Sequence, residues 1–282
     1  MKQEPTTHYS FVTKFHAMSC CPPTALPPLP TTSDLKPTKM GSADVFFFDN
    51  PASDRCVLVF PDVFGVDSGR TKENCVKLSA YFKVALIEMD SAGDFPDPMA
   101  GTPWMWPFDW LRQLLAMFPV MKWIKARPFE TAIRPKIDDT IQHLKAQHGV
   151  TKFAAIGYCW GAWMVAKYST VEATDIVCGV SFHPSWRAED VYHGTGSGAK
   201  LAEVVRVPQL VLSAIDDPNW LHPGGKVDKL LQKKPFASKV RLFSDVNHGW
   251  VNRGDLSNPV VAEAVRQAWD VEAVPFLQKH LQ

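Results

Sequence analysis

The segment Gly157-Tyr158-Cys159-Trp160-Gly161 places a cysteine midway between two glycines. It directly follows the apolar run 153–156 and directly precedes a helical stretch that begins at Ala162. A strand that turns sharply into a helix in this way lifts the central side chain clear of the sheet, and glycines are needed where flanking side chains would collide with neighbouring elements. The partial positive charge at the start of the helix favours thiolate over thiol. The alternative is an ordinary buried cysteine, but the flanking strand and helix favour Cys159 as a nucleophile.

A cysteine nucleophile needs a base and a group that orients the base, and both residue types occur downstream. Asp216 and Asp217 follow the strand-like run 209–213, and His248 follows the run 240–243. The order nucleophile, acid, histidine is typical of α/β-hydrolases. These context features favour His248 as general base over a surface-loop histidine, and they predict its ring nitrogen within hydrogen-bond reach of the Cys159 sulfur.

The acid is assigned to Asp217, with Asp216 kept as the alternative. Asp217 precedes Pro218, which biases its backbone toward an extended conformation that suits a side chain reaching out of the loop. The other aspartate would then serve the turn through its own side chain. His183 is a rival base in principle, but His183-Pro184-Ser185 at a strand end is interpreted as a structural corner.

Short β-branched and aromatic runs alternate with amphipathic stretches from residue 43 onward. The strand-like runs are Val45–Phe48, Cys56–Phe60, Val84–Met89, Phe153–Gly157, Val177–Phe182, Gln209–Ser213 and Val240–Phe243. Helical periodicity is found in Thr71–Tyr81, Pro128–Gln147, Trp160–Ser169 and Asn258–His280. This alternation predicts an α/β fold, with a mostly parallel central sheet and helices on both faces. Ligands of such sheets bind beyond the carboxyl ends of the strands, where the residues named above lie.

The chain has 282 residues, 46% of them hydrophobic, which is enough apolar material for one large core. Its 30 Lys and Arg residues nearly balance 29 Asp and Glu residues, and no run of like charges suits nucleic acid. No apolar stretch approaches the roughly 18 residues of a membrane span, and residues 1–10 lack the core of a signal peptide. Six cysteines without paired metal-site spacing indicate a reducing compartment, so a cytoplasmic location is expected.

Residues 1–40 are rich in proline and threonine and are predicted to form an extended arm, followed by a single domain over residues 41–282. The adjacent thiols of Cys20 and Cys21 are interpreted as loop thiols rather than metal ligands. Residues 94–127 contain several tryptophans and prolines and follow the third predicted strand. They are expected either to pack over the sheet or to line an apolar or aromatic substrate site.

The joint pattern resembles the dienelactone hydrolase family over roughly residues 40–282. The matching motifs are Gly157-Tyr158-Cys159-Trp160-Gly161, Asp62-Val63-Phe64-Gly65, His183-Pro184-Ser185 and Asn247-His248-Gly249-Trp250. The opening Met18-Ser19-Cys20-Cys21-Pro22 is similar to the start of eukaryotic, especially fungal, members. The resemblance implies an α/β-hydrolase fold and a Cys-His-Asp triad that hydrolyses a small ester or lactone through an acyl-enzyme.

Carried over to this sequence, the resemblance implies an oxyanion hole formed by the backbone N–H groups of Val63 and Trp160. Similar bacterial members carry a glutamate at the position of Asp62, where it contacts the resting thiol, so the shorter side chain here is a departure. Arg253 is the residue that matches an arginine holding the substrate carboxylate. Trp250 is also assigned to substrate binding.

Two other functions are weighed against hydrolysis. The first is a non-catalytic binding protein that keeps the fold, and the second is a thiol-redox protein in which Cys20 and Cys21 resolve an oxidised Cys159. The intact set of candidate catalytic residues favours hydrolysis. We expect no metal or cofactor, a small-molecule ester or lactone substrate, no nucleic-acid or membrane partner, and a monomer or homodimer.

Overall fold

The protein is described by a computed structural model over residues 22, 24–27, 29–31, 33–89 and 118–282. In this part of the chain, one sheet has the strand order β1-β2-β4-β3-β5-β6-β7-β8. The strands are Thr38–Met40 (β1), Ala43–Phe48 (β2), Arg55–Phe60 (β3), Lys83–Ile87 (β4), Lys152–Tyr158 (β5), Ile176–Phe182 (β6), Gln209–Ala214 (β7) and Lys239–Phe243 (β8). β1 and β2 pair antiparallel, as do β2 and β4, and all other pairs are parallel. The predicted mostly parallel sheet is therefore confirmed.

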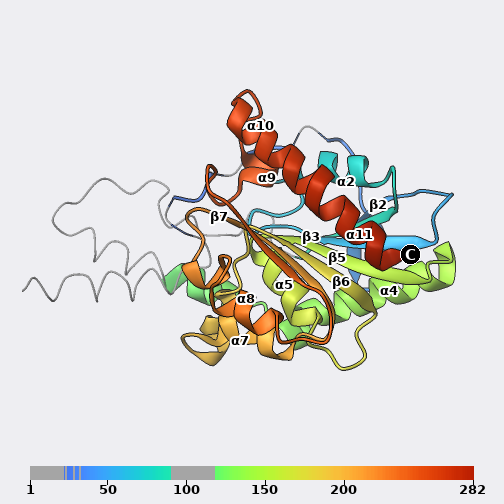
Figure 1. Cartoon of the computed structure of the whole chain (residues 1–282). Helices are drawn as coiled ribbons and strands as arrows, with labels where there is room; N and C mark the ends of the chain where they lie inside the picture. Colours follow the sequence, from blue (N-terminus) through green and yellow to red (C-terminus); the bar gives the residue numbers. More distant parts are fainter. Residues whose placement is uncertain (1–21, 23, 28, 32, 90–117) are drawn as a thin grey trace, which may run out of the picture.

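Helices cover both faces of the sheet, as Figure 1 shows. The helix α2 and the C-terminal helices α10 and α11 pack on one face, and α4, α5, α7 and α8 pack on the other. The helical segments are α2 Thr71–Leu78, η1 Phe129–Ile133, α4 Arg134–His148, α5 Trp160–Tyr168, α6 Ala188–His193, α7 Ser197–Val204, η2 Asn219–Leu221, α8 Lys226–Leu231, α9 Trp250–Arg253, α10 Pro259–Arg266, η3 Gln267–Ala273 and α11 Val274–Leu281. None of the helices in the described ranges is long and apolar enough to cross a membrane.

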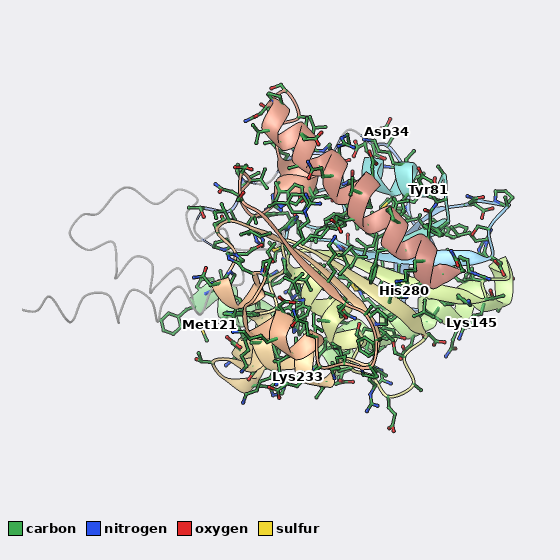
Figure 2. The ribbon with its side chains drawn as sticks, in the orientation of Figure 1. Asp34, Tyr81, Met121, Lys145, Lys233 and His280 are labelled. Atoms are coloured by element: carbon green, nitrogen blue, oxygen red, sulfur yellow. The ribbon has the colours of Figure 1, made fainter. Side chains whose placement is uncertain are left out.

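The central strands β3 and β5 are almost wholly apolar after their first residues because both of their faces are covered. In β3, Leu58 and Phe60 belong to the cluster beneath α4 and α5, whereas Val57 and Val59 belong to the cluster beneath α2, α10 and α11. Successive side chains of a strand point to opposite faces, so a strand between two helical layers has no polar face. Figure 2 shows side chains filling both layers, with Lys145 and Lys233 exposed at the outside.

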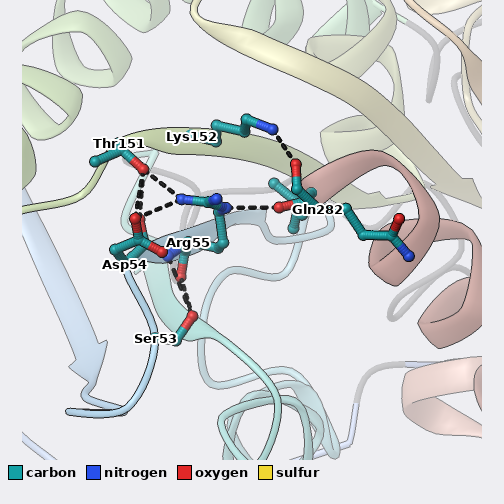
Figure 3. Close-up of polar contacts among 7 residues, drawn as sticks. Ser53, Asp54, Arg55, Thr151, Lys152 and Gln282 are labelled. Carbon is teal, nitrogen blue, oxygen red and sulfur yellow. Dashed lines mark hydrogen bonds and ion pairs between the residues drawn. The ribbon is translucent and has the colours of Figure 1, made fainter.

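At the amino ends of the parallel strands, hydrogen bonds join the sheet to the end of the last helix (Figure 3). Arg55, at the start of β3, donates from Nε to the Leu281 carbonyl at 2.6 Å and from Nη1 to the hydroxyl of Thr151 at 2.5 Å. Lys152, at the start of β5, donates to the carbonyl of Gln282. These contacts anchor α11 at the amino ends of the central strands, which leaves the carboxyl ends for the loops that carry the candidate site.

The described residues of the predicted arm that precede β1 form no helix, and Pro30 makes an isolated antiparallel bridge with Ser68. The strand β1 lies at the end of the range assigned to the arm and joins the edge of the sheet. Cys20, Cys21 and residues 94–117 of the tryptophan-rich segment lie outside the described residues.

Candidate active site

Cys159 lies between β5 and α5 in a backbone conformation that few residues adopt. Its φ is 53° and its ψ is −112°, and it directly precedes the first residue of α5. Such strained positions cost about 1 to 3 kcal/mol and are concentrated at functional sites. Glycine is required on both sides, because a Cβ at Gly157 would lie 2.2 Å from the Gly161 carbonyl carbon, and one at Gly161 would lie 2.3 Å from the Phe60 carbonyl oxygen. The sharp turn predicted from the sequence is present.

His248 and Asp217 form a buried hydrogen-bonded pair at the same edge of the sheet. The Nδ1 atom of His248 lies 2.6 Å from Oδ1 of Asp217. The second carboxylate oxygen of Asp217 accepts the backbone N–H of Ala214 at 2.7 Å, which fixes the carboxylate at the end of β7. Because Nδ1 is occupied by Asp217, the Nε2 atom is left to interact with other groups.

The electrostatic surroundings favour a protonated His248. Burial alone would lower its pKa, but the carboxylate of Asp217 and the neighbouring Cys159 together raise the pKa to about 10. The structure therefore brings His248 into interaction with both the candidate acid and the candidate nucleophile. Such surroundings favour the imidazolium form of His248 near neutral pH.

Asp216 contacts the backbone of His248 rather than its ring. Its Oδ1 accepts the His248 backbone N–H at 2.7 Å, and its Oδ2 accepts the hydroxyl of Thr24 at 2.5 Å. The two neighbouring aspartates thus make different contacts with one histidine.

The corner after β6 contributes a contact that was not predicted from the sequence. The hydroxyl of Ser185 lies 3.2 Å from the Cys159 sulfur, and the Ser185 backbone N–H donates to the Cys159 carbonyl at 3.0 Å. His183 packs against His248 with ring centroids 4.8 Å apart. Burial and the neighbouring His248 hold the pKa of His183 well below its usual range, so this ring is neutral. The position of Ser185 after a parallel strand could have indicated that it lies near the site. Its contact with Cys159 could not be predicted, because it depends on the positive φ of 35° at His183.

Asp62 and Arg253 form a fully buried ion pair. The Oδ2 atom of Asp62 also accepts the Asn252 amide at 2.9 Å and the Ser68 hydroxyl at 3.0 Å, and its Oδ1 accepts the Phe64 backbone N–H at 2.9 Å. Both charged side chains assigned to substrate binding are therefore bonded to each other in this structure. A role for either of them with substrate remains a prediction.

The other candidate residues surround the same loops. Val63 follows β3 and Trp160 begins α5, and both are fully buried. Trp250, also buried, packs against Phe243 with ring centroids 4.6 Å apart in the core under the C-terminal helices. Trp123 is the described member of the tryptophan-rich segment, and it packs edge-on against Trp160 at 4.7 Å. This contact places Trp123 beside the residue that follows Cys159.

The remaining described cysteines behave as buried core residues. Cys56, Cys75 and Cys178 are free, and burial raises the pKa of each thiol far above its usual range. Among the described residues, no three histidine, cysteine or acidic side chains are grouped to hold a metal ion.

A mostly parallel sheet with a strained turn between strand and helix, and with an acid and a histidine after the last two strands, is typical of the α/β-hydrolase fold. Solved structures agree on this fold. A putative dienelactone hydrolase from Klebsiella pneumoniae aligns with a TM-score of 0.51 and 13% identity over 89% of this chain and 100% of that chain. A dienelactone hydrolase from Anabaena variabilis aligns with a TM-score of 0.52 and 10% identity over 90% and 99%.

Sequence comparison identifies the family to which the chain belongs within this fold. The model of the dienelactone hydrolase family matches residues 116–281, which is more than half of the chain. The carboxymethylenebutenolidase homolog of Rattus norvegicus is 26% identical over 223 residues, covering 75% of this chain and 79% of the relative. Hydrolase tropI of Talaromyces stipitatus is 25% identical over 152 residues, and this match spans only 54% of the relative. The chain belongs to the dienelactone hydrolase family.

Proposed function

We propose that this protein hydrolyses a small carboxylic ester or lactone, with Cys159 as nucleophile, His248 as general base and Asp217 as the residue that orients the imidazole. The observation that supports this most strongly is the buried contact of 2.6 Å between His248 Nδ1 and Asp217 Oδ1. It fixes one ring nitrogen and leaves the other for the thiol, as nucleophilic catalysis requires. The tropI relative is named as a hydrolase, which is consistent with the same reaction class.

The reaction begins with the Cys159 thiolate attacking the carbonyl carbon. The oxygen that becomes negative is stabilised by the backbone N–H groups of Val63 and Trp160. The C–O bond then breaks, and the leaving oxygen takes the proton of His248, which leaves a thioester on Cys159. Water next loses a proton to His248 and attacks the thioester, and cleavage of the C–S bond releases the acid and restores the thiolate.

The nucleophile also limits the substrates. A thiolate leaves a tetrahedral intermediate more readily than an alkoxide does. The intermediate formed from an unactivated alkyl ester therefore mostly expels the Cys159 thiolate and returns to substrate. Lactones with enol leaving groups, aryl esters and thioesters do not have this disadvantage. The aromatic contact between Trp123 and Trp160 supports an apolar or aromatic acyl group.

Arg253 is proposed to contact a carboxylate on the substrate, with Asp62 as the residue that holds it beforehand. Their mutual ion pair neutralises both charges, and so a substrate carboxylate would have to compete with Asp62 for the guanidinium. Trp250, which begins the helix α9 that ends at Arg253, is proposed to support this contact.

The test is a turnover screen over lactones, aryl esters and thioesters, with wild type and Cys159→Ala compared. The matched control is Cys56→Ala, since Cys56 is a buried thiol near the opposite, amino end of β3. We expect Cys159→Ala to lose all activities and Cys56→Ala to keep them. Retained turnover in Cys159→Ala, or none in wild type on any substrate, would contradict the proposal, and peroxide-sensitive oxidation of Cys159 without turnover would favour a redox role.

A further inference from the structure

Thr24 and Leu26 of the N-terminal arm contact the loops that carry Asp216 and His248, and both contacts converge on His248. The backbone N–H of Leu26 donates to the His248 carbonyl at 2.9 Å. The hydroxyl of Thr24 donates to Asp216, whose other oxygen accepts the His248 backbone N–H. Both main-chain polar groups of the histidine are thereby bonded to the arm, one directly and the other through Asp216.

The arm also bonds to two further segments of the site. The Leu26 carbonyl accepts Arg253 Nε at 3.1 Å, and the Leu29 carbonyl accepts the backbone N–H of Gly69 at 2.6 Å. The Leu26 side chain packs against the core cluster beneath the C-terminal helices. The segments that follow β3, β7 and β8 are thus bonded to Thr24, Leu26 and Leu29 of the arm.

We propose that Thr24 and Leu26 position His248 and that Asp216 is a positioning residue that transmits the contact of Thr24. The proposal rests on His248 being the general base. His248 lies in a loop between β8 and α9, and Asp217 holds its ring through the Nδ1 atom. A side-chain contact at one nitrogen leaves rotation of the loop backbone unrestrained, whereas bonds to the backbone N–H and C=O groups restrain it. Displacement of a catalytic group by a fraction of an ångström lowers the rate while substrate affinity is retained.

The experiment compares Thr24→Val, Asp216→Ala and the double variant in the full chain. Loss of one such hydrogen bond is expected to lower kcat by about three- to tenfold with KM unchanged. The double variant should be no slower than Asp216→Ala, because both changes break one chain of contacts. Asp216→Asn keeps an acceptor for the His248 N–H and an amide that reaches the Thr24 oxygen, so it should restore most of the rate.

The matched control is Thr31→Val, which removes a hydroxyl of the same arm that accepts a bond from the nearby Ser33 N–H. Its kcat should equal that of wild type. The second readout is the rate of Cys159 alkylation by iodoacetamide against pH, because a displaced imidazolium stabilises the thiolate less. We expect its inflection to move to higher pH in Thr24→Val and Asp216→Ala.

A Thr24→Val variant with wild-type kcat and alkylation profile would overturn the proposal, and so would strictly additive losses in the double variant. Thr24 is exposed, and its replacement therefore tests the contact even where Asp216→Ala fails to fold. Full turnover in His248→Ala would instead refute the proposed function itself, so the two failures are distinguishable.

Discussion

Replacing Asp217 with asparagine should remove the charge that holds His248 in its protonated form while leaving the shape of the site intact. The asparagine can still accept the Ala214 N–H that the carboxylate accepts at 2.7 Å. It no longer offers a negative oxygen at 2.6 Å from Nδ1, and an amide nitrogen placed there would favour the wrong tautomer of the ring.

The size of the effect follows from the pKa of His248, which rises from 6.5 to about 10 through Asp217 and Cys159 against the effect of burial. At roughly 1.4 kcal/mol per pKa unit, the net effect of the two partners and the opposing burial is to stabilise the imidazolium by about 5 kcal/mol. Loss of Asp217 leaves burial opposed by Cys159 alone, and so the pKa of His248 should fall. The thiolate would then lose its counterion near neutral pH, and kcat should drop by about 10³- to 10⁴-fold.

The assay combines steady-state turnover of an aryl ester with the pH dependence of Cys159 alkylation. Asp216→Asn is the matched control, because it makes the same chemical change one residue away and at a contact with the His248 backbone. We expect it to stay within a few-fold of wild type. A turnover of Asp217→Asn within tenfold of wild type, or a larger loss in Asp216→Asn, would refute the reasoning.

The other predictions concern the fold and its response to pH. Gly161→Ala should lower the free energy of unfolding by about 3 kcal/mol or more, because its Cβ would collide with the Phe60 carbonyl, and unchanged urea denaturation would contradict this. Arg253→Met leaves the buried Asp62 carboxylate without its counterion and should cost about 3 to 5 kcal/mol in the same measurement, whereas a loss below 1 kcal/mol would show that the pair is not essential. The raised pKa of His248 adds stability that is complete below pH 6.5 and is lost as pH rises toward about 10. The free energy of unfolding from urea denaturation should therefore fall across this pH window, and it should fall less in a variant that lacks Asp217. A free energy of unfolding that does not change with pH in wild type would contradict the ion pair of His248 and Asp217.

The fold could be predicted from the sequence where the apolar runs were long enough to indicate a buried strand. The runs around β3 and β5 predicted strands buried on both faces, and the structure confirms them. By contrast, β1 has only three residues, two of them the polar Thr38 and Lys39, so no pattern distinguished it from the arm. Its pairing with β2 across a short turn depends on tertiary contact rather than on its own sequence.

The candidate site was predictable in composition but not in detail. Cys159, His248 and the two aspartates were located because each follows a strand, and parallel strands bring these positions to one edge. The preference for Asp217 as the acid followed from Pro218, whereas the contacts of Asp216 with Thr24 and the His248 backbone could not be derived, because they join distant parts of the chain. The contacts of Ser185 with the thiol and of Leu26 with His248 join distant parts of the chain, and only packing determines them.

The most direct test of the account is mass spectrometry of the intact protein, quenched in acid within the first turnovers on an activated lactone. Ring opening by Cys159 keeps the whole lactone on the sulfur, so the account predicts a mass increase equal to that of the lactone. Peptide mapping should assign it to Cys159, it should be removed by hydroxylamine, and it should be absent from Cys159→Ala. Hydrolysis that proceeds at the same rate without any such adduct, or an adduct on another residue, would contradict a cysteine acyl-enzyme.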